Sequence, residues 1–223
     1  MASAVFGPAT FCAVTGGSRG LGRSIAVLLA GRLGQGSRLV LTGRSLQGLQ
    51  ETKRQVEEKS PNQLEVKLVT GDLEDSAAHA AHFCDIFADA QQGTFKNALM
   101  IHNAATLGDG TKKASEHSDP QILTKYYAAN LTSVITLTSK FMKVMAEEDP
   151  DVRVLSYSPG PLDTDMLHTV RSCGNKGVED LLTSMESSGM ILSPADSAEH
   201  LLNLLEKDTF QSGDFLDIFN FKY

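Results

Sequence analysis

The chain has 223 residues, 41% of them hydrophobic, and a formal net charge of −7 at neutral pH. This length suits a single domain spanning residues 1–223, and the acidic balance argues against nucleic acid or an anionic membrane as the main partner. Cys12, Cys84 and Cys173 have neither metal-ligand nor redox spacing, so free thiols in a reducing compartment are expected. Residues 1–10 lack the pattern of a signal peptide and no apolar run has transmembrane length, so the predicted location is the cytoplasm.

Strands and helices are predicted to alternate along the chain. A short apolar strand over 11–15 runs into glycines, and leucine and isoleucine then recur at helical spacing from Leu21 until Gly34. The further elements are a strand over 38–42, a helix over 46–59, a sheet-edge strand over 64–68, a helix over 75–91, a strand over 98–101, a long helix from 119 to about 145, a strand over 152–157, a helix over 194–206 and a strand over 215–219. This alternation predicts an α/β fold with a doubly wound parallel sheet of the Rossmann type.

The first turn has the composition of a phosphate-binding loop. It reads Thr15-Gly16-Gly17-Ser18-Arg19-Gly20-Leu21-Gly22, directly between a predicted strand and a predicted helix. Gly16 permits a sharp turn, while Gly20 and Gly22 permit close approach of the backbone to a pyrophosphate at the helix N-terminus. The context favours a dinucleotide site over the alternative, a purely structural turn.

Two arginines indicate which dinucleotide is bound. An NAD site has an acidic residue after the second strand for the ribose 2′-hydroxyl, but this chain has Gly43-Arg44-Ser45 there, and Arg19 lies in the glycine turn. Two guanidinium groups suit a 2′-phosphate, so NADP(H) is the predicted cofactor. The alternative is that Arg44 is a solvated surface side chain.

The spacing Thr-Gly-x-x-x-Gly-x-Gly resembles the short-chain dehydrogenase/reductase family. That resemblance implies that Asp72-Leu73 lies near the adenine and that Asn130 supports the active site. In the run His102-Asn103-Ala104-Ala105, Asn103 and Ala104 match the family, whereas His102 replaces an asparagine and Ala105 a glycine. The methyl group of Ala105 is a mild departure at a place where the backbone usually lies close to the cofactor.

The resemblance narrows to the sepiapterin reductases within that family. The run 153–166, which contains Pro-Gly-Pro-Leu-Asp-Thr-Asp-Met, carries it together with residues 104–109, 130–143 and 204–217. It implies the NADPH-dependent reduction of a pterin side-chain ketone, the last step toward tetrahydrobiopterin. Asp217 matches the family's pterin-binding aspartate, since a carboxylate accepts paired N–H groups with two parallel bonds. The alternative for Asp217 is a surface acid at the end of a strand.

The resemblance also assigns individual contacts. Gly160 and Asp217 are predicted to bind substrate. The predicted cofactor contacts are Gly16, Gly17, Ser18, Arg19, Gly20, Leu21, Gly22, Arg44, Ser45, Asp72, Leu73, Asn103, Leu162, Asp163, Thr164, Asp165, Met166 and Leu167. No metal site is predicted: His79 and His82 lie one helical turn apart without further ligands, so a surface helix face is expected. Tyr126 and Tyr127 are expected to pack against the sheet.

The catalytic segment of the family is missing. The family uses a serine, a proton-donating tyrosine and a lysine four residues after it, but no Tyr-x-x-x-Lys occurs in the 223 residues. Only 29 residues separate Asn130 from Gly160. This interval holds one helix and one strand, but not a further strand and helix of about 5 and 12 residues. The chain is therefore predicted to be one strand and one helix shorter than the family, with the junction near Val144-Met145.

This gap leaves two hypotheses open. One is an active reductase, with Tyr157 as a stand-in donor if the strand over 152–157 shifts into the vacant place. The other is a catalytically inactive splice variant or incomplete gene model that at most binds NADPH or pterin, or pairs with a full-length chain. In this family the missing helix builds the dimer interface, and a central parallel strand is buried on both faces. Loss of both predicts poor solubility or partial disorder, and loss of the family homodimer.

Overall fold

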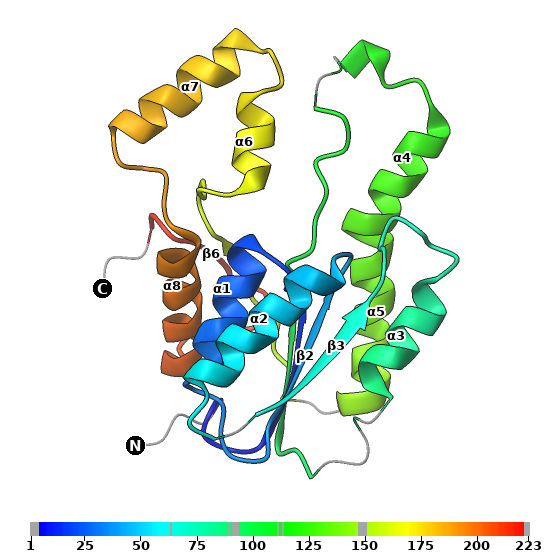
Figure 1. Ribbon diagram of the computed structural model, residues 1–223, viewed down its shortest axis with the longest axis vertical. Helices are drawn as coiled ribbons and strands as arrows, with labels where there is room; N and C mark the ends of the chain where they lie inside the picture. Colours follow the sequence, from blue (N-terminus) through cyan, green and yellow to red (C-terminus); the bar gives the residue numbers. More distant parts are fainter. Residues whose placement is uncertain are drawn as a thin grey trace.

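The computed structural model describes residues 5–62, 64–88, 90, 94–110, 112, 114–146 and 151–220 (Figure 1). Its strands are β1 (Thr10–Thr15), β2 (Arg38–Gly43), β3 (Glu65–Thr70), β4 (Asn97–Ile101), β5 (Ser156–Ser158) and β6 (Phe215–Asp217). Its helices are α1 (Gly20–Leu29), α2 (Leu46–Lys59), α3 (His79–Phe87), α4 (Pro120–Tyr127), α5 (Ser133–Phe141), α6 (Asp165–Arg171), α7 (Lys176–Ser187) and α8 (Pro194–Lys207). A 3₁₀ turn, η2 (Ala114–Glu116), and two π-helical segments, η3 (Ala128–Thr132) and η4 (Met142–Ala146), complete the assignment.

Four strands form a parallel sheet in the order β3-β2-β1-β4. In its register Cys12 of β1 lies beside Leu39 of β2 on one side and Leu99 of β4 on the other. Every residue of β1 is buried, as expected for a central parallel strand. The predicted parallel Rossmann-type sheet is confirmed, and β3 lies at its edge as predicted.

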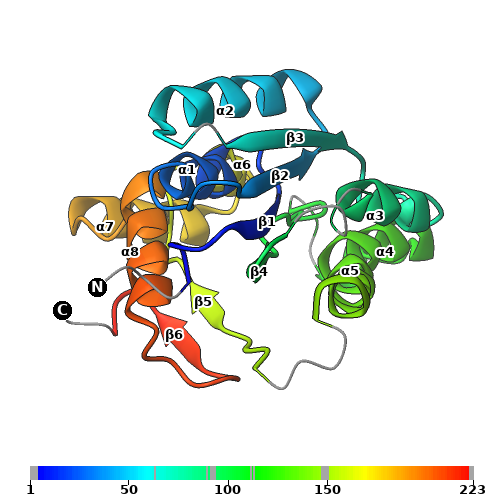
Figure 2. The same ribbon diagram turned by 90° about the horizontal axis from the view of Figure 1, so that it is seen from below.

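Helices cover both faces of this sheet (Figure 2). Side chains alternate along β1, so Cys12 and Val14 join the core under α1, α2 and α8, whereas Phe11 and Ala13 join the core under α3 and α5. The carboxyl ends of the four strands meet at one edge of the sheet, and that edge carries the candidate site.

The strands β5 and β6 form a separate two-stranded parallel sheet. The predicted strand over 152–157 is thus wrong in extent, because only residues 156–158 pair. The shift of this strand into the vacant place beside β4 does not occur either. In the described part of the chain, β4 pairs with β1 alone and β5 pairs with β6 alone.

One helix prediction needs correction, and two helices of the structure were not predicted. The helix over 75–91 begins only at His79, because the Asp75 carboxylate accepts a hydrogen bond from the Ala77 N–H at 3.1 Å and holds residues 75–78 in turns. Residues 89 and 91 of that prediction lie outside the described residues. Helices α6 and α7 were not predicted at all.

Two predictions about side-chain burial are wrong. His79 and His82 are 6% and 7% exposed, because the face of α3 that carries them packs against the sheet ends rather than facing solvent. Tyr126 and Tyr127 are 37% and 53% exposed, so neither is buried against the sheet as predicted. In the described residues, no helix combines the length and apolar character needed to cross a bilayer.

Candidate functional site

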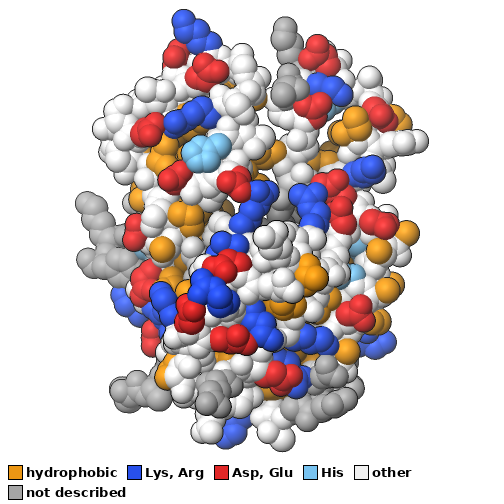
Figure 3. Space-filling view, viewed as in Figure 1, with side chains coloured by type: hydrophobic (Ala, Val, Ile, Leu, Met, Phe, Trp, Pro, Cys, Tyr) orange, Lys and Arg blue, Asp and Glu red, His pale blue; other side chains and the backbone are white. Residues whose placement is uncertain are grey.

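A cleft of about 1330 Å³ opens at the carboxyl ends of the strands. Figure 3 shows a hollow in this face between helices α6 and α7 on one side and helix α4 on the other, with acidic and basic side chains at its rim. The glycine turn, the loops after β2, β3 and β4, and the segment leading into α6 line it. The lining residues predicted from the sequence are Gly16, Ser18, Arg19, Gly20, Leu21, Arg44, Ser45, Asp72, Leu73, Asn103, Gly160, Leu162, Asp163, Thr164, Asp165, Met166 and Leu167. Gly17, Gly22, Asn130 and Asp217 do not line it.

The glycine turn has a backbone conformation that favours glycine. Gly16 and Gly20 have φ values of +71° and +55°, in the left-handed region. A Cβ on Gly22 would lie 2.4 Å from the Gly16 carbonyl oxygen, so α1 packs directly on the turn. The residue before α1, Arg19, makes no side-chain capping bond, and the first turn has no acidic residue. The first N–H groups of α1 are therefore suited to an anion such as a diphosphate.

Thr15 and Asn103 tie the glycine turn to the end of β4. The Thr15 hydroxyl oxygen accepts hydrogen bonds from the Asn103 and Ala104 N–H groups, both at 3.0 Å. The Asn103 side-chain amide in turn donates to the Thr15 carbonyl oxygen at 2.9 Å. Asn103 thus holds the glycine turn in its conformation. Thr15, which makes these bonds, was not predicted from the sequence as a site residue.

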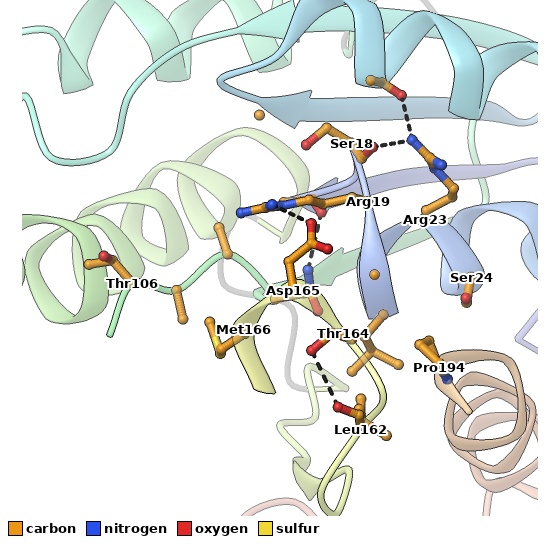
Figure 4. Close-up of a pocket in the computed structure, with 18 of the residues that line it drawn as sticks. Ser18, Arg19, Arg23, Ser24, Thr106, Leu162, Thr164, Asp165, Met166 and Pro194 are labelled. Atoms are coloured by element: carbon orange, nitrogen blue, oxygen red, sulfur yellow. Dashed lines mark hydrogen bonds and ion pairs between the residues drawn. The ribbon is translucent and has the colours of Figure 1, made fainter. Parts of the chain in front are cut away.

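The two arginines assigned to a 2′-phosphate are both ion-paired within the cleft. Arg44 lies 3.4 Å from the Glu74 carboxylate, and Arg19 is paired with Asp165 at the start of α6 (Figure 4). All four side chains are at least 30% exposed, so these pairs are weakly held. A phosphate can therefore replace either carboxylate as the partner of its arginine.

Asn130 lies where the α4–α5 helix is locally π-helical. Its carboxamide oxygen accepts the Thr106 N–H at 3.0 Å, and its NH₂ donates to the Thr106 carbonyl oxygen at 3.0 Å. The segment η3 surrounds Asn130, and π-helical turns often mark functional positions. Asn130 thereby fixes the loop after β4, whose Thr106 lines the cleft.

Asp217 lies at the end of β6, outside the lining of the cleft. Its carboxylate accepts hydrogen bonds from the Ser158 hydroxyl and, at 2.9 Å, from the Phe219 N–H. These bonds, with the Ser158 bond first, lower the pKa of Asp217 and keep it ionised. Gly160, by contrast, lines the cleft with φ of +74°. A pterin-binding role for Asp217 stays a prediction.

Tyr157 is held away from the cleft. Its hydroxyl donates to the Ser197 carbonyl oxygen at 3.0 Å, and its ring stacks on His200 with centroids 5.9 Å apart. Among the described residues that line the cleft, none is tyrosine or lysine. The described residues also contain no group of three or more His, Cys, Asp or Glu side chains placed to hold a metal ion.

Comparison with known proteins places this chain in a family. Residues 10–150 match the short chain dehydrogenase family. Sepiapterin reductase of Meriones unguiculatus is 32% identical over 252 residues, which cover 94% of this chain and 96% of that protein. The chain belongs to the short-chain dehydrogenase family. The sepiapterin reductase of Mus musculus is equally similar to this short-chain dehydrogenase, at 32% identity and the same coverage.

A solved structure confirms the fold of this short-chain dehydrogenase. L-Sorbose reductase from Gluconobacter frateurii, crystallised with NADPH and L-sorbose, matches with a TM-score of 0.74 at 18% identity, covering 98% of this chain and 97% of that one. The 252 aligned positions of the Meriones protein exceed the 223 residues of this chain. The alignment therefore includes positions of the relative without a counterpart here, in line with the predicted missing segment.

Proposed function

We propose that this chain is a sepiapterin reductase-type protein that binds NADP(H), and that these 223 residues do not catalyse the family's reaction. That reaction is the NADPH-dependent reduction of a pterin side-chain ketone in tetrahydrobiopterin biosynthesis. The observation that carries the proposal is the composition of the cleft. The glycine turn, Arg19 and Arg44, which are predicted to bind the cofactor phosphates, line it, and its described lining contains neither tyrosine nor lysine. The relatives named sepiapterin reductase support the substrate class, and the free cysteines are consistent with a cytoplasmic protein.

The residues present fit an NADP(H) molecule. The N–H groups at the start of α1 would hold the diphosphate, and Arg44 and Arg19 would hold the 2′-phosphate. Asp72 and Leu73 would lie beside the adenine, and the segment 162–167 would cover the nicotinamide. The cofactor, when bound, supplies a hydride.

The chemistry that this chain lacks is proton transfer to the alkoxide. Such a donor must lie within hydrogen-bond reach of the reacting oxygen, and its pKa must be near the working pH. An unperturbed tyrosine has a pKa of about 10, and Tyr157 is moreover bonded to Ser197 outside the cleft. Hydride transfer without a positioned donor is slowed by the 10²–10⁴-fold that general acids typically contribute.

Two measurements on the purified 223-residue protein test the proposal. NADPH binding is followed by cofactor fluorescence, and NADPH oxidation by absorbance with sepiapterin as substrate. Saturable binding without oxidation above background is the expected result. Oxidation well above background would overturn the claim of inactivity, and absence of binding would overturn the claim of a cofactor site.

Arg44→Ala tests the cofactor preference. Losing a charged hydrogen bond to phosphate is expected to weaken NADPH binding about tenfold and to leave NADH binding within twofold. Arg54→Ala serves as the matched control, because Arg54 is an exposed arginine on α2 that does not line the cleft. Equal losses for NADPH and NADH would contradict the assignment of Arg44 to the 2′-phosphate.

A further inference from the structure

Two buried histidines on α3 lie directly behind the loops that follow β2 and β3. His79 and His82 are 6% and 7% exposed. Their ring centroids lie 5.1 Å and 5.9 Å from that of Phe83, so the rings form one packed aromatic group. Neither histidine lines the cleft, and the proposed function gives them no task.

His82 joins the ends of the two strands. Its Nε2 lies 2.8 Å from the hydroxyl oxygen of Thr42 near the end of β2, and its ring donates a hydrogen bond to the Thr70 carbonyl oxygen at the end of β3. A neutral imidazole has a single N–H, so with that group donated to Thr70, Nε2 accepts from the Thr42 hydroxyl. Burial lowers the pKa of His82 and favours this neutral form.

The ring of His82 also rests on the backbone beyond β3. A Cβ on Gly71 would lie 2.3 Å from His82 Nδ1, so glycine is required for the ring to sit there. The imidazole of His79 holds the following residues, with its Nε2 at 2.9 Å from the Leu73 carbonyl oxygen. The two histidines together fix the backbone from Thr70 to Leu73 against α3.

The segments held in this way form one end of the cleft. Arg44 and Asp72 line it from the loops after β2 and β3. The two loops also meet directly, since the Gly71 N–H donates to the Gly43 carbonyl oxygen at 3.2 Å and Glu74 pairs with Arg44. The spacing between Arg44 and the Asp72–Leu73 segment therefore depends on the contact that His82 makes with both strands.

We propose that His82, supported by His79, is a positioning residue for the adenosine 2′-phosphate end of the cofactor. By linking Thr42 to the end of β3, it sets the distance between the arginine that meets the phosphate and the backbone that meets the adenine. This inference rests on the proposed binding of NADP(H). It adds a determinant of cofactor affinity that makes no contact with the cofactor itself.

The test uses adenosine 2′,5′-bisphosphate, the part of NADP that would occupy this end, with binding measured by calorimetry. His82→Phe keeps a planar ring and removes both hydrogen bonds, whereas His82→Gln retains a terminal amide at the position of Nε2. Thr42→Val and Thr42→Ser form a second pair, which removes or retains the hydroxyl that His82 meets. We expect the phenylalanine and valine variants to bind about tenfold more weakly, and the glutamine and serine variants to stay within threefold of the native protein.

His200→Phe is the matched control, because His200 is also a buried histidine but lies on α8 against Tyr157. It should leave the affinity unchanged. Circular dichroism establishes that each variant is folded, and if His82→Phe does not fold, the Thr42 pair decides. The positioning role is overturned if the folded valine variant binds as tightly as the serine variant. Failure of the native protein to bind both the bisphosphate and NADPH would instead overturn the cofactor proposal, and this inference with it.

Discussion

The hydroxyl of Thr15 offers the sharpest test of how the cleft is held together. Thr15 is 2% exposed, and its oxygen accepts the N–H groups of Asn103 and Ala104 at 3.0 Å each. Thr15→Val keeps the shape of the side chain but leaves both N–H groups without their acceptor. An orphaned donor costs about 1–3 kcal/mol when buried. Since these two groups are only partly buried, we expect the free energy of unfolding to fall by about 2–3 kcal/mol, out of a usual total of about 5–15 kcal/mol.

Urea denaturation and thermal melting measure this loss. For a chain of this length, each 1 kcal/mol lowers Tm by about 2–4 °C, so the valine variant should melt about 5–10 °C below the native protein. Thr15→Ser is the matched control, because it keeps the hydroxyl and loses one methyl group, at a cost of about 1 kcal/mol. A valine variant with the urea midpoint of the serine variant would refute the reasoning. NADPH affinity should fall in the valine variant alone, because the loop of Asn103 shapes the glycine turn.

Three further predictions concern side chains outside the lining. Tyr157→Phe removes the hydrogen bond to Ser197 and should cost about 1 kcal/mol of stability by denaturant titration while leaving any NADPH oxidation unchanged; a lost activity would identify Tyr157 as a donor. Burial lowers the pKa of His82 below its ordinary 6.5, so the unfolded chain protonates first, and stability present above pH 6.5 is lost as the pH falls from there. Melting at pH 7.5 and pH 5.5 should show a smaller difference for His82→Gln than for the native protein. Burial also raises the pKa of the Cys12 thiol, so a disulfide reagent should label exposed Cys84 in the native protein and Cys12 only after unfolding.

The sequence predicted the phosphate side of the fold because each signal there is local. The apolar runs that form β1 and β2 are followed or ended by Gly16 and Gly43. The positive φ of Gly16 favours glycine at that one position, so this signal can be read from the local sequence. The structural roles of Thr15 and His82 could not be predicted from local sequence. Thr15 bonds to a residue 88 positions away and His82 to one 40 positions away, and neither spacing leaves a pattern in a single sequence.

The elements that prediction missed are those with little buried apolar surface. Helix α6 has no buried residue and α7 buries only Leu182, so neither shows the apolar stripe by which a helix is predicted. The strand over 152–157 was overestimated for a related reason. Val154 is 58% exposed and lies before β5, which pairs with β6 alone in the described residues.

The proposed function assigns cofactor binding and proton donation to different parts of this fold. The contacts that shape the glycine turn come from Thr15, Asn103 and the packing of α1, which lies against α2 and α8. Among the described residues, none of these contacts involves the segment between Val144 and β5, where we predict that the family's catalytic strand and helix are missing. The predicted loss would fall on the side of β4 that faces away from β1, where β4 has no strand partner in the described part of the chain. The proposed deletion at this position would therefore remove the proton donor and leave every residue predicted to hold the phosphates, which is why binding and turnover must be measured separately.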